Sequence, residues 1–308
     1  MDKKITHFLH VPFTGLGLYG GFRGNRWLRN RIKIFKQFVV PSIKNQTNKD
    51  FILWVAWRYE EKTNPQVKEL KEYLTAERIP NVFTYSGIAF WDDKYPDDQA
   101  RDRLINAIHG ASGELVNVMG EAKTVLMTLQ PSDDCYHSTA VQEAKDYFLK
   151  NPNMDVFGYK KGYVMDYINE RVAEWNPKTT PPFYTIKYTR ENFVDPLKHV
   201  RFTGPYKSHE YLKDHMKAEY VDQRGFLVGT HSENISTIFN HPYAGHEYLG
   251  DNIRGILSDF GIAFAGKLEL PFSLRKWIIR QMPHTWRRKL RYIFGEKIAA
   301  PLYNWVRS

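Results

Sequence analysis

An apolar run that stops at two adjacent carboxylates constrains the fold of this chain more than any other feature. Residues 124–129 read TVLMTL, and Asp133 and Asp134 follow shortly afterwards. A short run of β-branched and apolar residues is typical of a buried strand in a parallel sheet. The segment STAVQEAKDYF then places apolar residues at helical spacing behind Ser138, a residue type that caps helices. The order of strand, acidic turn and helix predicts an α/β protein.

The acidic turn is the first candidate site. In open α/β sheets the ligand lies beyond the carboxyl ends of the strands, and this pattern puts Asp133 and Asp134 there. Carboxylates are hard oxygen ligands, so the pair predicts a site for Mg²⁺ or Mn²⁺ bridging a diphosphate. The alternative is that both carboxylates only cap the following helix or solvate a turn.

The first 150 residues alternate between strand and helix patterns. Buried strands are predicted over residues 5–13, 51–59 and 81–90, and helices over residues 27–47, 64–79 and 97–113. Pro41 interrupts the first of these helices late in its course. Such alternation favours a mostly parallel sheet that helices cover on both faces.

The pattern changes after Asn151. Short aromatic strands are predicted over residues 155–167, 181–189 and 198–204, then a helix over residues 208–220 and an apolar segment that ends at His231. We therefore predict a nucleotide-binding half over residues 1–150 and a mixed acceptor-binding half of the same domain over residues 151–270.

Composition limits the cellular setting. With 308 residues and 42% hydrophobic content, the chain is long enough to bury a sizeable core. It offers neither a secretory signal region nor an uninterrupted apolar segment of about 18 residues, so we expect a cytoplasmic protein that does not span a membrane. The single Cys135 excludes an internal disulfide and a cysteine-based zinc site, and fits a small buried residue better than a nucleophile.

The positive charge is concentrated in residues 271–308. This basic tail holds nine Lys and Arg residues against one Glu, a net charge of +8, whereas the 35 bases and 33 acids before it leave +2. In this tail, tryptophans alternate with basic residues in short segments that prolines separate. This pattern favours peripheral contact with an anionic membrane. For a cytoplasmic protein, the contact would be with the inner face of the membrane. Packing of the tail as helices on the body is the alternative. Nucleic acid is disfavoured as a partner, because no nucleic-acid-binding motif accompanies the bases.

Three segments together resemble a known family. The order of WLRNRIKIFKQFVVPSIKNQTNKDFILWVAW, ARDRLINA and LMTLQPSDDCYH is similar to A-type-fold glycosyltransferases, in particular the rhamnosyltransferase family. The resemblance extends over about residues 5–240. It implies a DxD motif after the fourth strand that binds the metal and the nucleotide-sugar diphosphate. Here Ser132 replaces the first Asp of that motif, which leaves Asp134 as the implied metal ligand and Asp133 as a group outside the metal shell or in contact with the sugar.

Transfer of a sugar requires further groups. The leaving diphosphate needs positive charge, which Arg101 is placed to supply unless it only pairs with Asp98 or Asp102 on its helix. Similar enzymes carry a late His that completes the metal site, and His231 has that place, although a lone His is more often merely hydrogen-bonded. For the base that activates the acceptor hydroxyl, the resemblance points to Glu210. Its rivals are Glu247 and Asp251, and Glu210 can also be a plain carboxylate of a first helical turn.

The sequence thus predicts a metal-dependent hexosyltransferase, and the family resemblance implies that the sugar it transfers is rhamnose. It would move a sugar from a nucleoside-diphosphate sugar to a hydroxyl of a glycan or lipid-linked saccharide, with inversion. Two other classes stay open. A metal-dependent phospho- or nucleotidyltransferase would use the same carboxylates, and a non-catalytic membrane-associated binding protein would be compatible with the missing first Asp.

Overall fold

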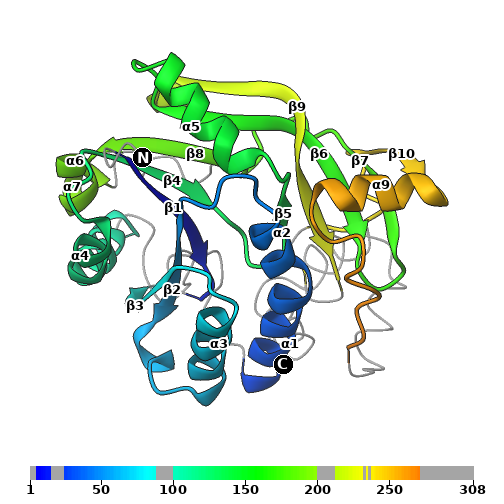
Figure 1. The fold of residues 1–308 in the computed structure, drawn as a ribbon, viewed down its shortest axis with the longest axis horizontal. Coiled ribbons are helices and arrows are strands. Elements are labelled where there is room, and N and C mark those ends of the chain that lie inside the picture. Colours follow the sequence, from blue (N-terminus) through cyan, green and yellow to red (C-terminus); the bar gives the residue numbers. More distant parts are fainter. Residues whose placement is uncertain are drawn as a thin grey trace, which may run out of the picture.

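The architecture is mixed α/β, built around one open sheet (Figure 1). The structure is a computed structural model that describes residues 5–14, 24–87, 100–199, 212–231, 234 and 237–270. The strands of this part are β1 Ile5–Pro12, β2 Ile52–Arg58, β3 Asn81–Gly87, β4 Thr124–Leu129, β5 Cys135–Tyr136, β6 Val156–Asp166, β7 Arg171–Trp175, β8 Tyr184–Thr189, β9 Ala218–Thr230 and β10 Ala244–Tyr248. The helices are α1 Asn25–Ile34, a π-helical turn Phe35–Val39, α2 Val40–Lys44, a 3-10 turn Tyr59–Glu61, α3 Pro65–Ala76, α4 Ala100–Met119, α5 Ala140–Lys150, α6 Arg190–Val194, α7 Pro196–His199, α8 Leu212–His215 and α9 Asp251–Asp259.

The sheet joins strands from both halves of the chain. Its order is β10-β7-β6-β8-β4-β1-β2-β3, and β9 pairs with β6 and with the short β5. The strands β3, β2, β1 and β4 run parallel, as their buried apolar sequences predicted, with Phe8 opposite Ile52 and Ile5 opposite Thr124. The carboxyl ends of these four strands therefore lie at one edge of the sheet.

The expectation of a mostly parallel sheet is wrong for the second half of the chain. There β4–β8, β6–β8, β6–β7, β7–β10 and β5–β9 are antiparallel, and only β6–β9 is parallel. For β6 and β7 the reason is connection length. Only a four-residue turn joins β6 to β7, whereas a parallel pair needs a crossover of a dozen residues or more.

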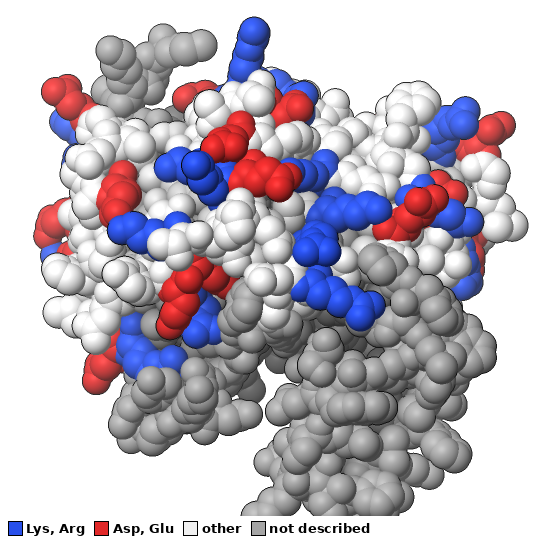
Figure 2. All heavy atoms as spheres, turned by 90° about the horizontal axis from the view of Figure 1, so that it is seen from below, with Lys and Arg blue, Asp and Glu red and all other residues white. Residues whose placement is uncertain are grey.

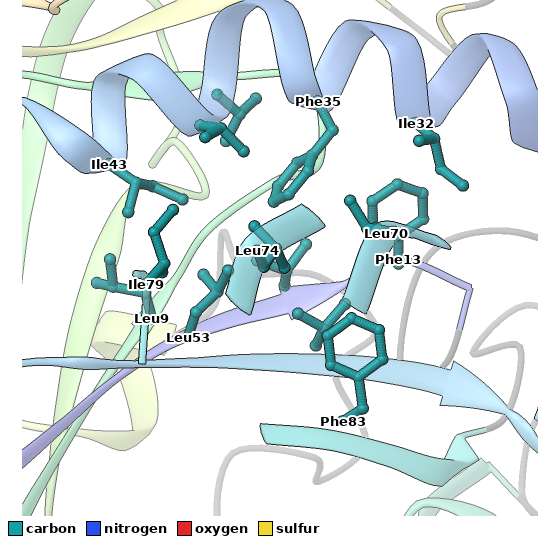
Figure 3. Close-up of a cluster of buried hydrophobic side chains, with 14 of the residues drawn as sticks. Leu9, Phe13, Ile32, Phe35, Ile43, Leu53, Leu70, Leu74, Ile79 and Phe83 are labelled. Atoms are coloured by element: carbon teal, nitrogen blue, oxygen red, sulfur yellow. The ribbon is translucent and has the colours of Figure 1, made fainter. Parts of the chain in front are cut away.

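Two cores cover the parallel strands, one on each face. On one face the helices α1 to α3 pack against β1, β2 and β3, through residues such as Phe35, Leu70 and Leu53 (Figure 3). On the other face α4 and α6 pack against the same strands through residues such as Ile108 and Phe193. A Cβ on Gly110 of α4 would lie 2.5 Å from the Ser86 side chain, so glycine lets this helix approach β3 closely.

Three helical expectations need correction. The helix predicted to end at residue 113 continues to Met119, because its apolar face stays buried beyond Gly113. Pro41 does not end the first helix, because a π turn in which Val40 donates to the Phe35 carbonyl keeps it continuous into α2. Of the helix predicted over residues 208–220, the described part begins at residue 212, and there α8 ends at His215. Residues 218–220 instead pair with β6, and this tertiary pairing overrides the local helical pattern.

A strand was predicted over residues 198–204, but Lys198 and His199 are the last residues of helix α7. The rest of that segment lies outside the described residues. The strands β7 and β10 were not predicted.

Within the described residues no helix is both long and apolar enough to cross a membrane.

Charges are dispersed over the body. Figure 2 shows Lys and Arg interspersed with Asp and Glu over the described part of one face. Several Lys side chains of the described residues form exposed pairs with acids, such as Lys161–Asp222 and Lys198–Glu191, which contribute little to stability in water. The basic tail predicted to meet a membrane lies outside the described residues.

Candidate functional site

The acidic turn follows β4 at the carboxyl edge of the parallel strands. Gln130 fixes its shape, because its backbone N–H donates to the His10 carbonyl on β1 at 2.8 Å and its side chain donates to the Asp134 carbonyl at 2.8 Å. Ser132 is buried, with 4% of its surface exposed. The turn is thus tied to the neighbouring strand, and its geometry is set by the body of the sheet.

Asp133 is the centre of a network of donors. Its Oδ2 forms a short ion pair with Nη1 of Arg31 on α1 and lies 3.0 Å from Nε2 of His231, which follows β9. Asn234 Nδ2 is 3.4 Å from the same oxygen. Burial alone would raise the pKa of Asp133, but the Arg31 charge and the His231 hydrogen bond lower it to about 2. Asp133 is therefore an ionised carboxylate that links α1 to the end of β9.

Asp134 has a different environment. Its Oδ1 accepts the backbone N–H of Gly229 on β9 at 2.9 Å. Burial, reinforced by the charge of Asp133, raises the pKa of Asp134 well above its ordinary value. Only glycine fits at Gly229, because a Cβ there would lie 2.2 Å from the Asp133 carbonyl and 2.3 Å from the Tyr167 ring. The acidic turn and β9 are in direct backbone contact.

The predicted metal ligands Asp134 and His231 both lie at this site, but the imidazole bonds to Asp133. Within the described part of the chain, no three His, Cys, Asp or Glu side chains gather closely enough to hold an ion by themselves. The residues present therefore fit a divalent ion only in the manner usual for Mg²⁺, which is bound through one or two carboxylates together with substrate phosphates.

Cys135 is a structural residue, as the sequence indicated. Its side chain is fully buried, with Sγ 3.7 Å from the Tyr167 hydroxyl and 3.5 Å from the Phe38 carbonyl. Burial raises the pKa of this thiol to about 12, so it stays protonated at neutral pH and is a poor nucleophile.

Other predicted site residues are placed only in part. Arg101 lies in the first turn of α4, but its side chain is outside the described residues, and so is the whole of Glu210. Of the rival bases, Glu247 forms a two-point ion pair with Arg171, at 2.8 and 2.7 Å, and Asp251 begins α9 as an exposed residue. The Arg171 pair lowers the pKa of Glu247, which makes it a weaker base.

Sequence reasoning missed Arg31, although a signal was present. Arg31 stands four residues before Phe35 and seven before Phe38, on a row that faces the interior. A basic residue on such a row needs an acidic partner, because an unpaired buried charge is very costly. The sequence could not show which acid this is.

A second polar cluster lies after β1 and β2. The Thr14 hydroxyl donates to Oε2 of Glu61, and the Arg58 backbone N–H donates to the same oxygen at 3.1 Å. Glu61 is only 2% exposed, and burial raises its pKa. A buried carboxyl at the carboxyl ends of these strands is placed to bond to the polar groups of a ligand.

Comparisons with known proteins leave the family open. No protein-family model matches the chain, and neither does any curated protein. Among solved structures, a crystal structure of S. aureus TarS is similar with 13% identity and a TM-score of 0.36, over 98% of this chain and 54% of that one. The chain therefore spans about half the length of TarS, and a likeness of this degree assigns neither family nor activity.

Proposed function

We propose that the chain is a glycosyltransferase that takes its sugar from a nucleoside-diphosphate sugar. The observation that carries the proposal is the acidic turn, where Asp133 and Asp134 follow β4 at the carboxyl edge of four parallel strands. This edge is the ligand-binding side of open α/β sheets. The buried Thr14–Glu61 cluster at the ends of β1 and β2 adds polar groups for the rest of a nucleotide.

A divalent ion, Mn²⁺ or Mg²⁺, is part of the proposal. Asp134 is the carboxylate that would hold it, and His231 would contribute only by giving up its bond to Asp133. When bound, the ion would offset the negative charge that develops on the leaving diphosphate.

The remaining roles belong to the chain itself. Arg101, at the start of α4, would bind the diphosphate and stabilise its charge as it leaves. Glu210 would accept the proton of the acceptor hydroxyl while that oxygen forms its bond to the anomeric carbon and the bond to the diphosphate breaks. Attack from the side opposite the diphosphate inverts the configuration. The Arg171 pair weakens the case for Glu247 as this base.

The donor sugar is proposed to be a hexose, and rhamnose follows from the sequence resemblance alone. The acceptor is proposed to be a glycan or a lipid-linked saccharide at the inner face of a membrane. Its contact with the enzyme would be assisted by the basic tail, residues 271–308.

The test is a panel of nucleotide sugars, screened with and without Mn²⁺ for thermal stabilisation and for release of the nucleoside diphosphate. A ligand that binds only the folded state raises the melting temperature. Asp134→Asn should keep the fold and lose Mn²⁺-dependent stabilisation by the donor. Asp222→Asn, which removes an exposed carboxylate paired with Lys161, is the control and should retain it.

Full activity in Asp134→Asn would contradict the assignment of the site. Release of a phosphoryl or nucleotidyl product instead of a glycoside would favour the phosphotransferase alternative. Donor binding without any turnover would favour the non-catalytic one.

A further inference from the structure

A positive charge is built into the protein directly beneath the acidic turn. Arg31 is fully buried, and its guanidinium is ion-paired with Asp133 and lies over the Trp27 ring at 5.4 Å. A guanidinium is charged at any pH a folded protein experiences. The turn therefore carries a permanent counter-charge before any ligand arrives.

The Asp133 carboxylate is committed to partners within the protein. A single oxygen, Oδ2, meets Arg31, His231 and Asn234, and the Asp133 backbone carbonyl accepts the Tyr167 hydroxyl at 2.9 Å. These partners come from α1, from the segment after β9 and from the turn after β6. To ligate an ion through Oδ2, Asp133 would have to give up its side-chain contacts with α1 and with the segment after β9.

Asp134 is committed far less. It accepts one backbone N–H, from Gly229, and within the described residues no Lys or Arg side chain bonds to it. Of the two adjacent carboxylates, it is the one left to share a cation with a diphosphate.

We propose that Arg31 is a positioning residue that withholds Asp133 from the metal, so that the divalent ion binds together with the nucleoside diphosphate and only weakly without it. This inference rests on the proposed function. A single protein carboxylate is a poor cage for Mn²⁺ or Mg²⁺, and the diphosphate oxygens complete the shell. Removal of Arg31 should then release Asp133 as a second ligand.

The experiment is calorimetric titration of the full chain with Mn²⁺, alone and with UDP, GDP or dTDP. The parent should bind Mn²⁺ at least about tenfold more tightly with its nucleotide than without it. Arg31→Met should bind Mn²⁺ without nucleotide at least about tenfold more tightly than the parent does, because it gains a carboxylate and loses a nearby positive charge. Arg31→Lys, which keeps the charge, should behave like the parent.

A control separates this effect from the general cost of removing a buried cation. Lys145 is 7% exposed, and its ammonium lies 2.7 Å from Asp50. Both Lys145→Met and Arg31→Met should lower the melting temperature. Lys145→Met should leave the Mn²⁺ affinity unchanged. A folded Arg31→Met chain that binds Mn²⁺ no more tightly than the parent overturns the inference.

If Arg31→Met fails to fold, two other variants test whether Asp134, and not Asp133, binds the ion. With nucleotide present, Asp133→Asn should keep the parent's Mn²⁺ affinity and Asp134→Asn should lose it. If Asp133→Asn and Asp134→Asn lose Mn²⁺ affinity equally, the inference is overturned. It is also overturned if the parent binds no Mn²⁺ with any nucleotide. Turnover of nucleotide sugars is measured separately, so failure of the proposed function is recognised independently.

Discussion

Buried histidines make the protein sensitive to mild acid. His7, His10 and His199 are 1%, 6% and 3% exposed. His10 stacks on Trp54 with ring centroids 4.0 Å apart, and His199 stacks on Tyr188 at 4.9 Å. An imidazolium among these rings loses its hydration, which disfavours the charged form.

The sign of the effect follows from the direction of the pKa shifts. Burial, aided by the Lys145 charge for His7 and by His199 for His10, lowers both pKa values from 6.5 to about 3. Burial lowers the pKa of His199 to about 4. Below pH 6.5 the unfolded chain therefore takes up protons that the folded chain does not, and stability is lost as the pH falls.

The size of the loss is large for a single domain. At about pH 5, each of His7, His10 and His199 lowers the free energy of unfolding by about 2 kcal/mol relative to neutral pH, or about 6 kcal/mol together. Proteins are typically stable by only about 5–15 kcal/mol. The three histidines together should thus lower the free energy of unfolding by about 4 kcal/mol per pH unit between about pH 6 and pH 5.

Urea unfolding at a series of pH values measures this slope. His10→Gln removes one of the three imidazoles and should reduce the slope by about 1.4 kcal/mol per pH unit. Leu70→Ala leaves a cavity at a fully buried apolar site and removes no titratable group. It should lower stability by about 2–5 kcal/mol equally at every pH, which leaves the slope unchanged. A slope in His10→Gln equal to that of the parent would refute the argument.

Two further predictions concern segments outside the described residues. Glu210→Gln should retain donor affinity and lower kcat by about a hundredfold or more, the scale of losing a general base; if Glu247→Gln or Asp251→Asn shows this pattern instead, the base is reassigned. Truncation of the basic tail should abolish sedimentation with anionic vesicles at low salt and leave the melting temperature nearly unchanged. The cut belongs after Leu270, since Leu268 is buried and donates its N–H to the Tyr167 carbonyl at 2.7 Å. A truncated chain that aggregates would show that the tail belongs to the core.

The parallel half of the fold was predictable from the sequence for a physical reason. Strands covered on both faces are largely apolar, so β1, β2, β3 and β4 stand out as mostly apolar runs between amphipathic helices. The second half lacked this signal. β9 is exposed at its start and buried only towards its end, and β7 and β10 have just five residues each. Long-range pairing decides such segments, and local patterns do not report it.

The candidate site shows the same division. Asp133 and Asp134 were found because they end a buried strand, a local feature of the sequence. Of their partners, His231 was assigned to this site only through the family resemblance, and as a metal ligand, not as the partner of Asp133. Arg31, which lies 102 residues from Asp133 in the sequence, was not found. A charge in an amphipathic helix gives no local indication of which distant acid it will meet.

The contacts of the acidic turn also bear on position 132, where the family resemblance implies an acid and this chain has Ser132. A two-carboxylate motif at alternate positions would have an acid at position 132, but that side chain is buried under the turn. The second carboxylate stands at Asp133 instead, where it is turned towards Arg31 and His231, while Asp134 is turned towards Gly229. Because the adjacent side chains leave the turn towards different partners, they cannot substitute for each other. Environments that push the pKa values of two neighbouring carboxyls apart give them different chemical roles.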